Sequence, residues 1–209
     1  MGGTMERLLS TCGRTYAAQA GIRVADKPSP LYRLLVLSVL LSTRIRADLA
    51  VAAARELHRA GGGTPRGMLN ASWQDRVDAL GRAHYVRYDE STATALGEGA
   101  ELLLDRYRGD LRRMRAAAGG DVPRLERLLR EVPRLGPTGA AIFCREAQAV
   151  WPELRPYLDR RTLDGARRVG LPDDPDRLAS EVSGDDLAAL AAALVRVALD
   201  RQLAREVSG

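Results

Sequence analysis

The stretch VPRLGPTGAAIF, Val132 to Phe143, places two prolines, two glycines and a threonine directly before a helix-like apolar run. Such punctuation forces a tight turn and leaves the first amides of the following helix without acceptors inside that helix. Those amides can hold a phosphate that lies in front of them. Since an ordinary loop that caps a helix has a similar composition, the rest of the sequence has to decide between the two interpretations.

Outward from this stretch, the 209 residues predict an all-α protein. Leucine, alanine, arginine and glutamate dominate the long segments, and no stretch alternates apolar and polar positions with β-branched residues. The segment 31–42 is apolar on almost every face, which predicts a central helix. We expect helices over residues 6–20, 31–42, 47–60, 73–80, 89–107, 110–118, 122–131, 138–150, 160–169 and 174–182, and a last one from 185 onward.

Composition argues against several classes of protein. An apolar fraction of 45% excludes general disorder. The chain has no run of 18 apolar residues, and its first residues lack the features of a secretory signal, so we expect a cytoplasmic protein without a membrane partner. Two cysteines and two histidines match no disulfide framework, zinc site or iron–sulfur spacing, so we expect no metal and no cofactor.

The charge balance is basic, with a formal net charge of +5. This value suits a polyanionic partner, although a solvated basic surface without special purpose explains it equally well. Lys27 is the only lysine among the 32 basic residues. A mechanism that depends on a lysine amine therefore has one candidate.

A helix, the VPRLGP turn and a second helix form the layout of a helix-hairpin-helix, which grips a DNA phosphate without reading sequence. The segment resembles the hairpin of the endonuclease III family of DNA glycosylases, whose pattern is roughly L-P-G-V-G-x-K-T-A. Three further segments resemble that family in the same order: LLSTRIRAD (40–48), TPRGML (64–69) and LDRRTLDGARRVGL (158–171). The resemblance implies a two-lobed fold, with residues 30–151 in one lobe, 1–29 and 152–209 in the other, and DNA across the cleft between them.

The resemblance also implies roles for individual residues. Asp159 falls on the family's catalytic aspartate, and Arg44 stands where many relatives carry a glutamine that fills the space left by a flipped base. Residues implied in DNA binding are Arg134, Leu135, Gly136, Thr138, Gly139, Arg160 and Arg161. Breaking the bond between a base and deoxyribose builds positive charge on the sugar, which a carboxylate stabilises while it orients water. Asp159 is also placed to cap the helix that begins at Arg160, and the two roles are compatible.

The chain departs from the family pattern at informative positions. Arg134 replaces the first glycine of the hairpin, so the turn either is built differently or tolerates a side chain. We expect Gly136 to be required for this turn. Thr138 replaces the lysine with which bifunctional relatives form a Schiff base, and the C-terminal cysteine cluster is absent. Arg160 and Arg161 bind phosphates, pair with Asp159 or form a solvated face.

The segment AHYVRYDE, residues 83–90, gathers aromatic side chains in a chain that is only 4% aromatic. His84, Tyr85 and Tyr88, together with Arg44, are candidates to line a pocket for a flipped base. Buried tyrosines that pack a helix junction are the alternative. The two tryptophans and the single phenylalanine, Trp73, Trp151 and Phe143, are assigned to the core.

These observations together predict a monofunctional DNA glycosylase of base excision repair. It would act as a monomer on double-stranded DNA with a damaged base, without lyase activity. A non-catalytic DNA-binding or damage-recognition protein of the same fold is the alternative. A strand-cutting lyase is a further alternative, against which the single lysine argues. The identity of the damaged base stays open, because it depends on the shape of the pocket.

Overall fold

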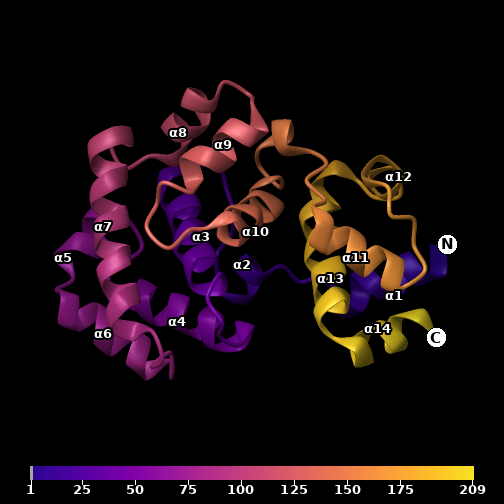
Figure 1. The fold of residues 1–209 in the computed structure, drawn as a ribbon, viewed down its shortest axis with the longest axis horizontal. Coiled ribbons are helices and arrows are strands. Elements are labelled where there is room, and N and C mark those ends of the chain that lie inside the picture. Colours follow the sequence, from indigo (N-terminus) through magenta and orange to yellow (C-terminus); the bar gives the residue numbers. More distant parts are fainter. Residues whose placement is uncertain (1) are drawn as a thin grey trace. The chain divides into compact units, whose positions relative to one another are not determined.

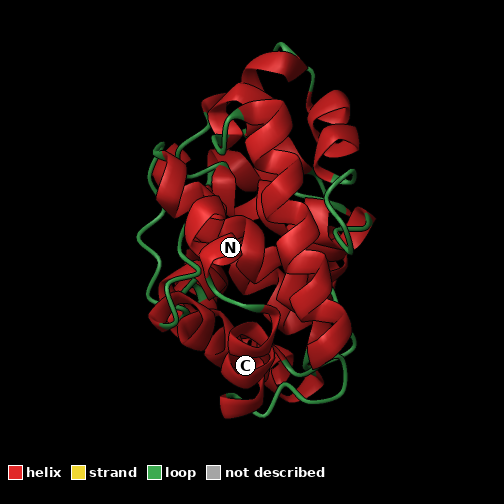
Figure 2. Cartoon of the chain, turned by 90° about the vertical axis from the view of Figure 1, so that its left-hand side faces the viewer, coloured by secondary structure: helices red, strands yellow, loops and turns green. Residues whose placement is uncertain are grey.

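The computed structural model describes residues 2–209, and all of the regular secondary structure in that range is helical, as the sequence predicts. Figure 2 shows these helices joined by loops and turns. The chain divides into two compact units. Unit 1 contains the residues up to Gln19 together with Cys144–Gly209, and unit 2 contains Ala20–Phe143.

The unit boundaries differ from the lobe boundaries expected from sequence, which lie at 29/30 and 151/152. The backbone passes between units at 19/20 and at 143/144. The boundary at 143/144 is explained by the buried side chain of Glu146. It accepts hydrogen bonds from the backbone amides of Tyr16 at 2.7 Å and Ala17 at 2.9 Å. The residues that follow Phe143 are thereby tied to the N-terminal segment.

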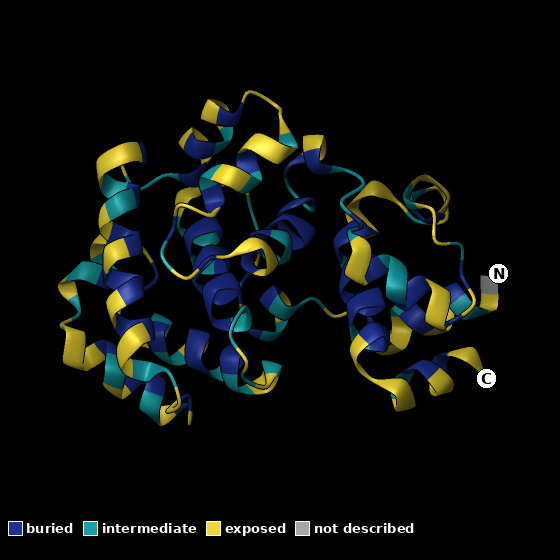
Figure 3. Cartoon of the chain, viewed as in Figure 1, coloured by how far each residue is buried: buried dark blue, intermediate teal, exposed yellow. Residues whose placement is uncertain are grey.

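Unit 2 is built around α3 (Pro28–Leu41), in which Leu31, Tyr32 and every residue from Leu34 to Leu40 are buried. Figure 3 accordingly colours most of this helix dark blue. This agrees with the central position predicted from its apolar sequence. Helix α5 was not among the predicted helices, since it is a short turn that begins with a proline. The helices of this unit are α3 (Pro28–Leu41), α4 (Ala47–Arg59), α5 (Pro65–Asn70), α6 (Trp73–Arg82), α7 (Asp89–Tyr107), α8 (Leu111–Ala118), α9 (Val122–Leu129) and the first part of α10 (Pro137–Ala147).

Unit 1 is built around α13 (Leu187–Leu199), which packs against α1 (Gly2–Cys12), α11 (Arg160–Arg168) and α14 (Arg201–Ser208) (Figure 1). Helix α11 approaches α13 so closely that a Cβ at Gly165 would lie 2.0 Å from the carbonyl oxygen of Leu194. The unit also contains α2 (Tyr16–Gln19), η1 (Pro152–Leu154), α12 (Pro175–Ser180) and η2 (Gly184–Asp186).

Two predicted helices are interrupted in unit 1. The expected helix over 6–20 is divided into α1 and α2, since residues 13–15 have no regular structure. The expected helix from 185 onward ends at Leu199, because Asp200 leaves the helical conformation and its carboxylate accepts from Gln202 N–H and Leu203 N–H to cap α14. No helix in residues 2–209 has both the length and the apolar character needed to cross a membrane.

The assignment of large aromatic residues to the core is correct for two of three. Trp151 and Phe143 are fully buried. Trp73 is 41% exposed, so its assignment is wrong. It is the first residue of α6, and its indole N–H donates to Thr94 Oγ1 of α7 at 3.0 Å, which holds the ring at the surface.

Candidate functional site

The turn between α9 and α10 is tight and contains a strained residue. Leu135 N–H donates to the carbonyl of Val132 at 3.0 Å. Arg134 has φ of 63°, which is the left-handed region that glycine enters without steric cost. A side chain in this region costs roughly 1–2 kcal/mol. The turn therefore tolerates a side chain at the position where the family pattern has its first glycine.

Helix α10 begins directly after this turn, with Gly136 before it and Pro137 in its first turn. Ala140 N–H donates to the carbonyl of Gly136, whereas the amides of Thr138 and Gly139 have no intrahelical acceptor by helix geometry. Gly136 and Thr138 are exposed, whereas Gly139, which was also expected to bind DNA, is buried. The start of α10 thus presents polar backbone at the surface, as a phosphate-binding hairpin requires.

Two hairpin residues behave differently from expectation. Gly136 does not have a left-handed φ, and a Cβ built on it would meet nothing within 4 Å, so the turn does not require this glycine. At Gly139 a Cβ would lie 2.6 Å from Leu135 Cδ1 and 3.2 Å from Ser42 Cβ. Leu135 is itself buried, so its side chain supports the turn and does not offer a contact surface.

The Arg134 side chain and carbonyl connect the hairpin to two other segments of unit 2. Arg134 Nη1 donates to Ser91 Oγ at 2.7 Å, and its guanidinium carbon lies 5.6 Å from the centre of the Tyr88 ring. Ser42 Oγ donates to the carbonyl of Val39 at 2.7 Å and also lies 3.3 Å from the Arg134 carbonyl oxygen. We call the residues joined in this way the hairpin cluster: Ser42, Tyr88, Ser91 and Arg134.

The predicted base-pocket residues occupy different environments around the hairpin cluster. Tyr85 is fully buried and its hydroxyl lies 2.7 Å from Thr43 Oγ1, so it packs a helix junction, and burial raises the pKa of its phenol. Tyr88 is half-buried, and the Arg87 guanidinium carbon lies 5.3 Å from its ring centre. His84, with φ of 57°, and Arg44 are both exposed.

Asp159 lies in unit 1 as the N-cap of α11. Its Oδ1 accepts from Thr162 N–H at 3.2 Å, and Thr162 Oγ1 donates to the Asp159 carbonyl at 2.6 Å. The Asp159 side chain is 25% exposed, so the carboxylate reaches the surface of the unit. The capping role expected from the sequence is confirmed, and the exposed part of the carboxylate leaves room for a second role.

The charged partner of Asp159 is Arg145, in the last turn of α10. Arg145 Nε lies 3.7 Å from Asp159 Oδ2, and the arginine side chain is buried. Arg160 and Arg161 are exposed, and neither forms an ion pair with another residue in the described range 2–209, so of the three alternatives for these arginines the pairing with Asp159 does not occur. Sequence inspection missed Arg145, because nothing near Asp159 in the sequence indicates this contact.

The backbone that leads to Asp159 is held by a buried amide. Gln148 Oε1 accepts from Tyr157 N–H at 2.9 Å, and Gln148 Nε2 donates to the Tyr157 carbonyl at 3.2 Å. Arg155 Nε in turn donates to the Gln148 carbonyl at 2.7 Å. Since Gln148 is fully buried, these bonds are shielded from competing water and fix the segment that precedes Asp159.

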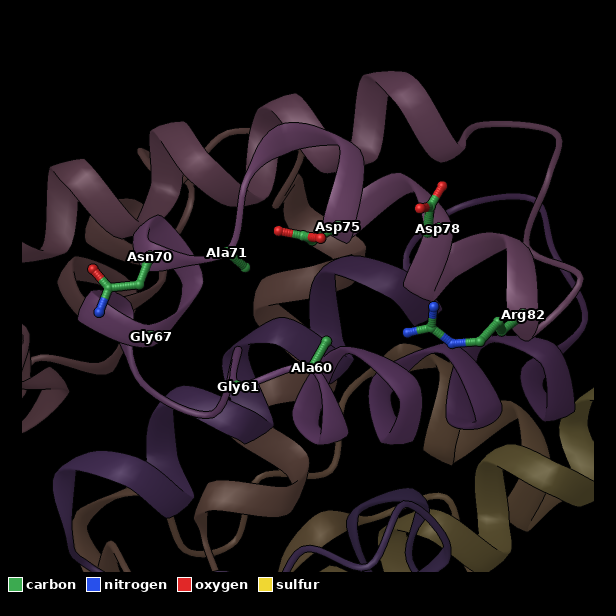
Figure 4. Close-up of a pocket in the computed structure, with 8 residues that line it drawn as sticks. All are labelled: Ala60, Gly61, Gly67, Asn70, Ala71, Asp75, Asp78 and Arg82. Atoms are coloured by element: carbon green, nitrogen blue, oxygen red, sulfur yellow. The ribbon is translucent and has the colours of Figure 1, made fainter.

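A pocket elsewhere in unit 2 contains none of the predicted site residues. Figure 4 shows Asp75, Asp78 and Arg82 of α6 facing Ala60 and Gly61 across this pocket. The guanidinium of Arg82 is paired with Glu56 at 3.0 Å, and the two aspartates disfavour a phosphate by charge repulsion. Comparison of the chain with protein-family models, curated proteins and solved structures finds no match.

Proposed function

We propose that the chain is a monofunctional DNA glycosylase of base excision repair, which flips a damaged base out of double-stranded DNA and hydrolyses its N-glycosidic bond. One observation carries this proposal. Arg134 adopts the conformation that a glycine supplies in the hairpin pattern, directly before a helix that begins with exposed backbone. Strained backbone conformations cluster at functional sites.

Binding of the DNA backbone is assigned to the hairpin and to two exposed arginines. The free first-turn amide of the exposed Thr138 suits a phosphate oxygen because it adds a directed hydrogen bond to the positive end of the helix dipole. Arg160 and Arg161 are exposed at the start of α11 and add positive charge beside Asp159 in the sequence. Contacts of this kind position DNA without reading its sequence.

Chemistry on the sugar is assigned to Asp159. As the base departs, positive charge develops on deoxyribose, and a carboxylate that is fixed beforehand stabilises that charge without reorganising. Thr162 N–H and Arg145 provide such fixation, because each lies against a different oxygen of the carboxylate. The same carboxylate would orient the water that attacks the sugar carbon.

The absence of an amine at the hairpin supports a hydrolytic product. Thr138 carries no nucleophilic nitrogen, and arginine stays protonated and is a poor nucleophile. Lys27, the single lysine, is exposed at the N-cap of α3. The expected product is an intact strand with an abasic site.

A panel of duplex oligonucleotides, each with one damaged base, tests the proposal. Strands that break only after hot alkali would identify an excised lesion and a glycosylase without lyase activity. A non-catalytic DNA-binding protein is the second candidate, because Thr162 and Arg145 hold the Asp159 carboxylate as they would hold a purely structural cap. Duplex binding that weakens as salt rises, with no base released from any lesion, would favour that candidate.

A further inference from the structure

Backbone strain is concentrated in and beside the hairpin cluster. Among residues 2–209, three residues other than glycine have a positive φ: His84, Arg108 and Arg134. Arg134 belongs to the hairpin cluster, and His84 lies in the segment that leads to Tyr88. Arg108, in contrast, is the C-cap of α7. Strained conformations persist only where surrounding contacts over-determine them.

Contacts of the kind that hold a strained residue are present at Arg134. Its guanidinium donates to Ser91 Oγ and lies over the Tyr88 ring, while Ser42 Oγ lies 3.3 Å from its carbonyl oxygen. The exposed Arg108 side chain forms no hydrogen bond or ion pair within the described part of the chain. The side chain of Arg134 therefore joins the hairpin to the segment that carries Tyr88, whereas the side chain of Arg108 makes no comparable connection.

The ring of Tyr88 has the surroundings of a nucleotide-stacking platform. The guanidinium carbons of Arg87 and Arg134 lie 5.3 Å and 5.6 Å from its centre, and both arginines are exposed. The two guanidiniums lie over this ring, and an unpaired base stacks on an arginine plane as well as on an aromatic ring, while the positive charge attracts the phosphates of the same strand. A base that remains paired inside a duplex does not expose its face, so this arrangement suits an unpaired nucleotide.

We infer that Arg134 is a positioning residue, which holds Tyr88 in place so that phosphate binding at the hairpin and stacking of an unpaired nucleotide occur together. This inference rests on the DNA-binding part of the proposed function and not on catalysis by Asp159. It also accounts for an arginine at a position where glycine would be free of strain.

The test compares two substitutions of the same kind. Arg134→Gly removes the side chain while keeping a residue suited to the left-handed turn, and Arg108→Gly does the same at a site outside the hairpin cluster. Each variant and the wild-type protein is titrated with a matched duplex and with the same duplex carrying one unpaired nucleotide. Hydrogen exchange of the backbone amides in residues 84–91 is measured without DNA.

We expect the wild-type protein to bind the duplex with the unpaired nucleotide about tenfold more tightly than the matched duplex, the range given by stacking of one base. Arg134→Gly should reduce this preference to less than about threefold and speed exchange in residues 84–91, because the tether to Tyr88 is lost. Arg108→Gly should leave both the preference and the exchange as in the wild-type protein.

Unchanged preference and unchanged exchange in Arg134→Gly would overturn the inference. An equal loss of affinity for both duplexes in the two variants would also overturn it, since Arg134 would then contribute charge alone. If the wild-type protein bound neither duplex, the proposed function would fail as well. Hydrogen exchange would then still show whether Arg134 holds the Tyr88 segment. If wild-type protein discriminates and Arg134→Gly does not, the inference stands even where no lesion is excised.

Discussion

Arg145 Nε lies 3.7 Å from Asp159 Oδ2, and the arginine side chain is only 10% exposed. An arginine so well covered offers little surface to a DNA phosphate. Since Thr162 N–H occupies the other carboxylate oxygen, Arg145 completes the set of contacts that orients Asp159. Its expected contribution is therefore to the rate of base release and not to DNA affinity.

Replacing Arg145 with methionine should lower the single-turnover rate of base release by about tenfold or more and leave the duplex dissociation constant unchanged. Opposite charges about 4 Å apart near a protein surface attract each other by a few kcal/mol, and a loss of about 1.4 kcal/mol already corresponds to a tenfold change in rate. Arg145→Lys should restore part of the rate. Arg168→Met is the matched control, because Arg168 donates to carbonyls of Val197 and Ala198 in the same unit. A wild-type rate in Arg145→Met would remove Arg145 from this role.

Replacing Asp159 with asparagine should lower the rate of base release by about a hundredfold or more, because the charge that stabilises the transition state is lost. Asparagine is also a good N-cap, so α11 and the thermal midpoint should be retained. Duplex affinity should stay similar or rise, since one negative charge is removed. Single-turnover assays at saturating enzyme measure the rate, and near-wild-type excision would exclude Asp159 as the catalytic group.

Substitutions at the two hairpin glycines should differ in effect. Gly136→Ala should change the free energy of unfolding little or raise it, because its added Cβ meets nothing within 4 Å. Gly139→Ala should lower it by about 1–3 kcal/mol, since the new Cβ is forced against Leu135 and Ser42. Urea denaturation measures both. Equal destabilisation by the two variants would contradict this description of the turn.

Stability should fall in mildly acidic solution because of His58. Burial, together with the nearby Arg33, holds the pKa of His58 below its ordinary value of 6.5. The unfolded chain therefore takes up a proton first, so the contribution of His58 is fully present above pH 6.5 and is lost as pH falls through the folded pKa. His58→Gln should remove this loss, whereas the exposed His84→Gln should keep it.

Urea denaturation between pH 5 and pH 7.5 measures the effect as a difference between each variant and the wild-type protein. Glu146 titrates in the variant and in the wild-type protein alike, so its effect on stability, which has the opposite sign, cancels in this difference. Burial raises the pKa of Glu146 above 4.5, so its contribution is present below pH 4.5 and is lost as pH rises through the folded pKa. Parallel curves for His58→Gln and the wild-type protein would show that His58 does not titrate differently on folding.

Borohydride should trap no covalent adduct between the protein and lesion DNA, because Thr138 replaces the amine that forms a Schiff base in bifunctional relatives. A bifunctional member of the endonuclease III family serves as the positive control. Gel electrophoresis under denaturing conditions detects the adduct. An adduct that disappears in Lys27→Ala would instead show that the single lysine acts as a nucleophile and that the lyase alternative is correct.

Local signals predicted most helices of this chain. Asp110, Asp121 and Asp174 each cap a helix close to the predicted start, because a cap depends only on neighbouring residues. The short helix α5 and the break at Asp200 were missed. Asp200 lies inside a run of good helix formers, so the sequence around it predicts one continuous helix. In the structure α13 ends at Leu199, and Asp200 caps α14.

The candidate site was only partly predictable for a related reason. The capping by Asp159 is local and was foreseen. Its contact with Arg145, and that of Gln148 with Tyr157, depend on how α10 packs against the segment that follows it. The burial of Tyr85 likewise depends on Thr43, which lies in a distant turn. Periodicity contains no information about such pairs.

Unit 1 combines an N-terminal and a C-terminal segment of the sequence, and this affects the order of folding during synthesis. Unit 2 is one continuous segment, so it can fold once residue 143 has left the ribosome. Helix α1 packs against α13 and α14, and Arg7 Nε donates to the carbonyl of Val207. At about 5–20 residues per second, α1 waits on the order of 10–40 s for these partners. During this interval its apolar face is a candidate ligand for chaperones.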